Sequence, residues 1–155
     1  FKDALANLEK AMELKSTDVD TQTLFIMALT QVMRDWRTAD QASALIEKYS
    51  SRFKELEKNN TYLSLATLIY LGQFLESYQD EKPVDGDKYK ARFEAIADQN
   101  KDLSIDHNLL GKAYSEAAVF YFRKGQVSKA KQLVATGLKY SPRNYELKAR
   151  QDMMK

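Results

Sequence analysis

Residues 111–144 read GKAYSEAAVFYFRKGQVSKAKQLVATGLKYSPRN. Apolar residues recur with the period of a helix on both sides of Gly125, and Pro142 ends the second segment. Small residues, Ala118 and Ala130, stand where two antiparallel helices would touch. Helix axes approach to about 8–10 Å only where the side chains between them allow it. The stretch therefore predicts a helical hairpin with a tight turn at Gly125.

The same periodicity predicts helices along the rest of the chain. The whole sequence has only two Pro and five Gly, so long segments lack helix breakers. Strand-like alternation is not evident, and an all-α domain is expected. Thr38 and Gln41 resemble a capping box before the third helix. The predicted helices cover about 1–14, 19–35, 38–58, 61–79, 87–99, 105–124 and 126–139, with a short one after Pro142; the second carries Leu24, Ile26, Met27, Leu29 and Met33.

DEKPVDGD, residues 80–87, is the clearest predicted loop. Pro83 and Gly86 disfavour a regular helix there, and four carboxylates favour contact with water. The carboxylates do not follow the spacing of a calcium-binding loop, because Lys82 and Val84 occupy ligand places. A solvated acidic loop is therefore expected.

Consecutive helices joined by short turns pack antiparallel, so the segments pair into hairpins that begin near residues 20, 61 and 105. The spacing of about 42 residues lies in the range typical of solenoid repeats. The chain begins at Phe1, and FKDALANLEKAMEL is helical from the outset. We interpret this segment as the second helix of a hairpin whose partner precedes it in a longer chain.

The last hairpin resembles the tetratricopeptide repeat family when its repeat begins at Gly111. Two places depart from the family pattern, since Val134 stands where an aromatic residue is usual and Gly137 where alanine is usual. A second register, from LGKAY at 110–114, would make the first helix too long before Gly125. The earlier hairpins match more loosely. The places that match are Tyr114, Ala118, Tyr121, Gly125, Ala130 and Pro142.

The resemblance implies an all-α, right-handed superhelix of antiparallel helix hairpins. About three such units plus terminal helices would form a single domain over residues 1–155. It also implies that the first helices of the hairpins line a concave groove. The residues at groove positions are Lys112, Ser115, Val119, Phe122 and Arg123 in the last hairpin, Gln73 and Glu76 in the middle one, and Gln31 and Arg34 in the first.

The function that this architecture implies is a non-enzymatic scaffold that binds a peptide or protein segment in the groove. Phe122 would supply apolar contact area, and Arg123 would bind a carboxylate or a backbone carbonyl. The alternative for Phe122 is simple packing against a neighbouring helix.

A further alternative for the function of the chain is a helical flank of a larger enzyme or envelope protein. A truncated solenoid exposes an apolar end, so self-association through the first helix is a further expectation.

Charge is uneven along a chain whose net charge is only +2. Residues 111–155 carry ten Lys and Arg against three acids, whereas residues 1–110 carry fourteen against nineteen. This pattern favours a solvated basic surface or an acidic partner. Nucleic-acid binding is the alternative function, and the low net charge argues against it. Its candidate residues are Lys112, Arg123, Lys124, Lys129, Lys131, Lys139 and Arg143.

Motifs for other chemistry are missing from the sequence. There is no Cys, no phosphate-binding glycine loop, and a single histidine, His107, which follows Asp106 at a helix start. We therefore predict no catalytic residue, no metal site and no cofactor. No apolar run reaches the roughly 20 residues that cross a bilayer. Bacterial cytoplasm and envelope are equally compatible with this composition.

Overall fold

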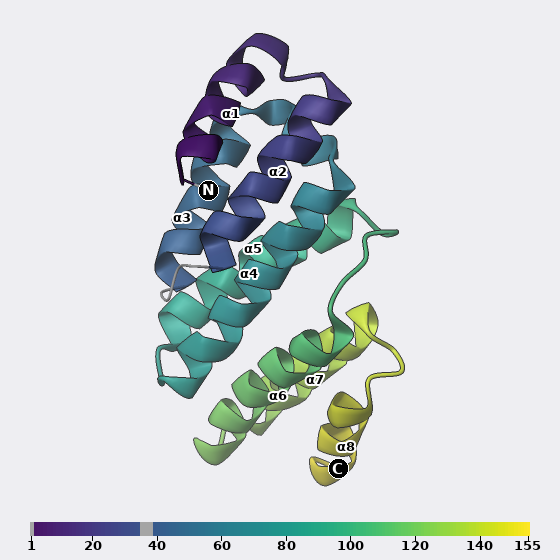
Figure 1. The fold of residues 1–155 in the computed structure, drawn as a ribbon. Helices are drawn as coiled ribbons and strands as arrows, with labels where there is room; N and C mark the ends of the chain where they lie inside the picture. Colours follow the sequence, from purple (N-terminus) through teal and green to yellow (C-terminus); the bar gives the residue numbers. More distant parts are fainter. Residues whose placement is uncertain (1, 35–38) are drawn as a thin grey trace. The chain divides into compact units, whose positions relative to one another are not determined.

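The computed structural model describes the backbone of residues 2–34 and 39–155, and the side chains of the same ranges without residues 39 and 40. These residues form helices and no strand, which confirms the predicted all-α class (Figure 1). The capping box expected at Thr38 lies outside them. The helices are α1 (Lys2–Lys15), α2 (Val19–Arg34), α3 (Ala39–Arg52), the 3-10 helix η1 (Lys54–Lys58), α4 (Asn60–Gln79), α5 (Pro83–Gln99), α6 (His107–Arg123), α7 (Val127–Tyr140) and α8 (Tyr145–Met153).

The chain divides into two compact units, Phe1–Ile69 and Tyr70–Lys155, which we call the N-terminal and the C-terminal unit. The boundary falls within α4. Each unit has its own aromatic core and is described by itself below. A single domain over residues 1–155 stays a prediction.

In the N-terminal unit, α1 and α2 form an antiparallel pair (Figure 1). Glu9 of α1 ties this pair to α3: its carboxylate accepts a hydrogen bond from the Tyr49 hydroxyl and pairs with Arg52 at 2.9 Å. Phe25 of α2 packs edge-on against the rings of Tyr49 and Phe53, with centroids 4.8 and 5.7 Å away. The core of this unit is therefore aromatic, and a part-buried polar contact lies at its edge.

The predicted third helix, to residue 58, is wrong in its last six residues. The α-helix ends at Arg52, Phe53 adopts φ −120° and ψ 86°, and η1 follows. Phe53 is buried, so the helix breaks where this ring enters the core. Asn59 then caps α4, because its Oδ1 accepts a hydrogen bond from the Tyr62 N–H at 3.1 Å.

In the C-terminal unit, aromatic rings join four helices. Phe74 of α4 lies edge-on to Tyr114 of α6, with ring centroids 5.0 Å apart. Phe93 of α5 meets Tyr114 at 6.4 Å and Tyr140 of α7 at 5.4 Å. The last helix, α8, packs on α6 and α7 and buries Leu147 completely. Ala118 and Ala130 are fully buried, as the predicted close contact of α6 and α7 requires.

The loop predicted at residues 80–87 is wrong, because α5 begins at Pro83 and only residues 80–82 lie between the helices. Pro83 occupies the first turn of α5, where a missing N–H costs no helical hydrogen bond. Gly86 lies inside the helix because the Tyr78 ring packs over it, and a Cβ there would lie 2.5 Å from that ring. The two helix breakers thus start a helix and let an aromatic ring approach it.

The turn between α4 and α5 has the same geometry as the turn between α6 and α7. The Lys82 N–H donates to the Ser77 carbonyl at 2.7 Å, and the Gln126 N–H donates to the Tyr121 carbonyl at 2.9 Å. Glu81 and Gly125 hold the matching left-handed position, with φ of 56° and 78°. Each turn is a Schellman motif, and corresponding residues are 44 positions apart.

Opposite effects are expected from substitutions at these two positions. A left-handed backbone costs a residue with a Cβ roughly 1 kcal/mol, and glycine almost nothing. Gly125→Ala should therefore lower the free energy of unfolding by about 1 kcal/mol, and Glu81→Gly should raise it by up to about 1 kcal/mol. Urea denaturation measures both, and a loss of stability in both variants would contradict the equivalence of the turns.

Candidate functional site

A groove of about 480 Å³ runs along α2 in the N-terminal unit. We call it the α2 groove. From Thr23 to Arg34 it spans roughly 16 Å of helix, at about 1.5 Å per residue. Both residues predicted for the first hairpin line it. Its lining includes Ile26, Met27, Gln31 and Arg34 of α2, Ala4 of α1 and Thr61 of α4.

The α2 groove combines apolar and polar surface. The Met27 side chain is 61% exposed, and the thioether of Met adapts to varied apolar partners. The Thr30 hydroxyl is already used, since it donates to the Ile26 carbonyl at 2.7 Å. Arg34 is exposed and has no carboxylate partner among the described residues. The groove therefore offers a flexible apolar contact beside a cation that is available to a ligand.

Two predicted groove positions are wrong. Ser115 is buried, and its hydroxyl accepts a hydrogen bond from the Arg150 Nε of α8 at 2.8 Å. The C-terminal helix thus covers this part of α6. Gln73 is also buried, as are its neighbours Tyr70, Leu71 and Phe74 on α4.

The other predicted positions in the C-terminal unit remain accessible. Lys112, Arg123 and Glu76 are exposed. Val119 is half-buried, and Phe122 is 37% exposed. Phe122 therefore both packs on its neighbours and presents apolar surface next to Arg123. Neither Val119 nor Phe122 is sealed inside the unit.

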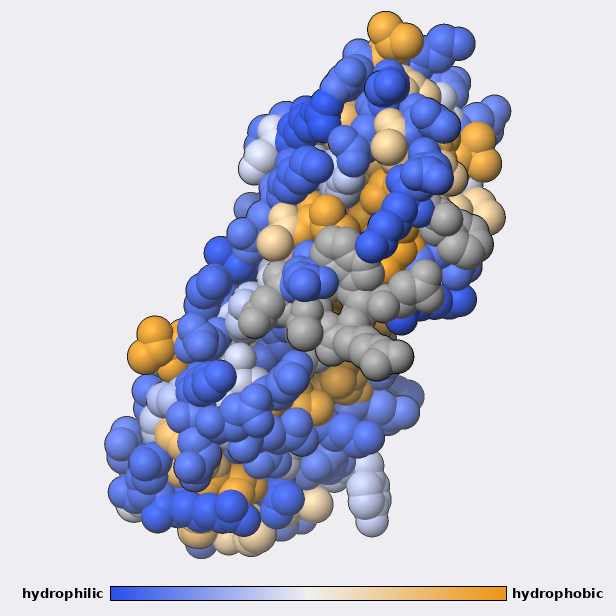
Figure 2. Space-filling model, turned by 60° about the vertical axis from the view of Figure 1, so that its left-hand side comes forward, coloured by the Kyte–Doolittle hydropathy of each residue, from blue (hydrophilic) through white to orange (hydrophobic). Residues whose placement is uncertain are grey.

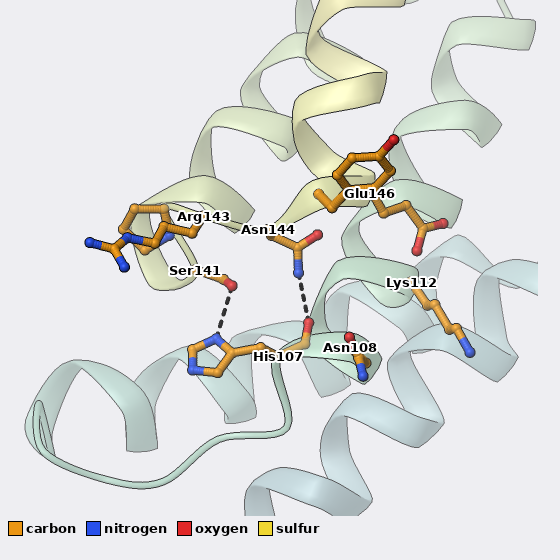
Figure 3. A pocket seen from close by; sticks show the side chains of 9 residues that line it. His107, Asn108, Lys112, Ser141, Arg143, Asn144 and Glu146 are labelled. Carbon is orange, nitrogen blue, oxygen red and sulfur yellow. Dashed lines mark hydrogen bonds between the residues drawn. The ribbon is translucent and has the colours of Figure 1, made fainter.

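A second and larger cleft, of about 750 Å³, lies where α6 and α8 begin. We call it the α6–α8 cleft. In Figure 3, Lys112 and Arg143 lie at opposite ends of it. His107 and Ser141 both line the cleft, and the His107 Nδ1 lies 2.8 Å from the Ser141 Oγ (Figure 3). The Asn144 amide donates a hydrogen bond to the His107 carbonyl at 2.7 Å. These bonds hold His107 at the start of α6, where the sequence predicted a helix start.

The α6–α8 cleft was not predicted, and the contacts of the Asn144 side chain show why. Its Oδ1 caps α8 by accepting the Leu147 N–H at 3.1 Å, while its side chain occupies the space above Gly111. A Cβ at Gly111 would collide with this amide. One side of the cleft is formed by residues at and after the closing Pro142, where the helical periodicity of α7 has ended, so their approach to the start of α6 leaves no periodic signal. The one local clue is an asparagine before a helical segment.

Several features bear on the other predicted functions. Within the described ranges, no three His, Cys, Asp or Glu side chains are grouped so that they could hold a metal ion. None of the described helices is long and apolar enough to cross a membrane. The apolar residues Leu5 and Met12 of α1 are buried, and on the face shown in Figure 2 hydrophobic side chains form separate patches on a hydrophilic surface. Self-association through α1 stays a prediction.

No family of known proteins, no curated protein and no solved structure matches the chain. Membership of the tetratricopeptide repeat family therefore stays a prediction.

Proposed function

We propose that this chain is a non-enzymatic protein-interaction module that binds a segment of a partner protein in the α2 groove. The observation that carries the proposal is the groove itself. Gln31 and Arg34, chosen from the repeat pattern, line it together with the apolar side chains of Ile26 and Met27. Ligand sites of this kind combine a mostly apolar lining with a few polar groups that orient the ligand.

The two matching hairpins support a repeat architecture, and with it a binding role. Gly86 of α5 and Ala130 of α7 are 44 residues apart, and both are small and buried at the start of the second helix. The turns before them have the same hydrogen bonds. We propose that the chain forms a right-handed superhelix of about three tetratricopeptide-like hairpins. Such arrays present extended concave surfaces to their partners.

The chemistry of the α2 groove suits a segment that carries an apolar side chain and a nearby carboxylate. Met27, which is exposed, would contact the apolar side chain, while Ile26 also lines the groove but is almost fully buried. The Arg34 guanidinium would bind the carboxylate through paired N–H donors. The area is small compared with a standard protein interface, so the affinity should be modest and depend on these few contacts.

Met27→Asp is expected to weaken binding of such segments at least about tenfold, because a charge would replace the apolar contact. Peptides are first selected from a displayed library on the unchanged protein. Their affinities for both proteins are then measured by isothermal titration calorimetry. Leu14→Asp is the matched control, since Leu14 is 85% exposed on α1 and does not line the groove.

Two outcomes would locate the site elsewhere. Selected peptides that bind Met27→Asp and Leu14→Asp equally well contradict the α2 groove as their site. The double variant Phe122→Ala with Arg123→Ala then tests the exposed end of α6. Loss of binding in that variant alone, with unchanged helicity by circular dichroism, would assign the peptides to α6.

A further inference from the structure

The cations of residues 111–155 are not neutralised within the protein. Of the ten Lys and Arg in this stretch, only Lys155 has a carboxylate within ion-pair distance in the part of the chain that the structure describes. Some cations of the N-terminal unit do find partners, as Lys48 and Arg52 do with Glu9. The contrast indicates a local positive potential that attracts an acidic ligand.

The α6–α8 cleft concentrates this potential in a concave site. Lys112 on α6 and Arg143 on the turn before α8 are both exposed, and both line the cleft. Glu146 is the single acid in its lining and forms an ion pair with neither cation. A ligand with two or more carboxylates could therefore meet a cation at each end (Figure 3).

Tyr145 adds an apolar contact at the same place. Its side chain is 89% exposed, although it lines the cleft. Tyrosine and arginine are the residues that most often dominate the energy of protein interfaces. The cleft wall beside it is held by the His107–Ser141 and Asn144–His107 contacts, so little ordering is needed when a ligand binds.

We propose that the α6–α8 cleft is a second docking site and binds an acidic segment of a partner protein that carries one apolar side chain. Lys112 and Arg143 bind carboxylates, and Tyr145 contacts the apolar side chain. A short acidic segment fits better than nucleic acid. Residues 70–110, which belong to the same unit as the cleft, carry nine acids against five cations, and Glu146 lies in the cleft, so a long polyanion would meet repulsion. The proposal does not depend on the α2 groove.

The test uses a short fluorescein-labelled peptide of glutamates around one leucine, and fluorescence anisotropy on the whole chain. The double variant Lys112→Gln with Arg143→Gln and the single variant Tyr145→Ala should each weaken binding about tenfold or more. The matched control is Lys131→Gln with Lys139→Gln, which removes the same charge from α7 outside the cleft. This control and Met27→Asp should bind as the unchanged protein does.

Three outcomes would overturn the proposal. Equal losses in the two charge-removing pairs would show a diffuse basic surface. Tighter binding of a single-stranded oligonucleotide of the same length would assign the cleft to nucleic acid. Loss of the acidic peptide in Met27→Asp would place it in the α2 groove. Circular dichroism of every variant separates these results from unfolding.

Discussion

Gly137→Leu is expected to lower the free energy of unfolding by about 3 kcal/mol, enough to unfold a marginally stable chain. Gly137 is buried in α7, where Tyr114 of α6 and Leu147 of α8 approach its backbone. Even a Cβ there would lie 2.6 Å from the Leu147 Cδ1 and 3.0 Å from the Tyr114 Cβ. A leucine would push apart the three helices that meet at this point, because a close-packed interior cannot absorb the added volume.

Gly72→Ala is the matched control, because Gly72 also lies inside a helix of the C-terminal unit. A Cβ at Gly72 meets nothing within 4 Å. Alanine stabilises a helix by about 1 kcal/mol relative to glycine, so this variant should be more stable than the unchanged protein. Thermal and urea denaturation followed by circular dichroism give both values. A Gly137→Leu protein as stable as Gly72→Ala would show that α6, α7 and α8 do not pack as described.

Gly137 also shows where a repeat pattern stops being informative. The pattern expects alanine at this place, and the sequence alone gives no reason for the glycine. The reason lies with Leu147, which follows the closing Pro142 and is outside the repeat. Helices α6 and α7 themselves were predicted to within two residues at each end, because their spacing and breakers are local features.

The misplaced loop at residues 80–87 has a different cause. Sequence rules treat Pro83 and Gly86 as helix breakers, because proline inside a helix removes a hydrogen bond and glycine loses more backbone entropy than other residues. Here Pro83 takes the first turn, and Gly86 makes room for Tyr78. The choice between the two outcomes depends on a residue of the preceding helix, which local propensity does not include.

Only part of the candidate site could be predicted, because a sequence pattern does not include contacts from other helices. The repeat pattern selected Gln31 and Arg34, and both line the α2 groove; that they bind a partner stays a prediction. The pattern failed for Ser115 and Gln73, since it identifies a face of a helix but not what covers that face. Met27 is the reverse case: an apolar residue expected to help pack the second helix is exposed and lines the α2 groove.

Alkaline pH is expected to unfold the chain through three buried tyrosines. Burial raises the pKa of Tyr49, Tyr78 and Tyr114 well above the ordinary value of 10.0, and carboxylates raise each of them further. The Tyr49 hydroxyl donates to Glu9 and the Tyr78 hydroxyl to Asp87. Ionising any of these tyrosines in the folded protein would place a second negative charge beside a carboxylate in an apolar setting.

The direction of the pH effect follows from the raised pKa values. The folded protein keeps the three protons, while the unfolded chain releases them above about pH 10. Their stabilisation is therefore complete below pH 10 and is lost as the pH rises. One pH unit above that value, three tyrosines together cost about 4 kcal/mol, at roughly 1.4 kcal/mol each. Most of the stability of a typical domain would be gone at that point.

Tyrosinate absorbance and circular dichroism, recorded in one alkaline titration, test this mechanism. The absorbance of the three buried tyrosines should appear together with the loss of helicity. Tyr114→Phe removes one titrating group and the 2.7 Å hydrogen bond to Glu94. It should lower stability at neutral pH by about 1 kcal/mol and reduce the contribution of the three buried tyrosines to the pH dependence above pH 10 by about one third. If all tyrosines ionise while helicity persists, water reaches these hydroxyls in the folded state, and their burial does not control alkaline unfolding.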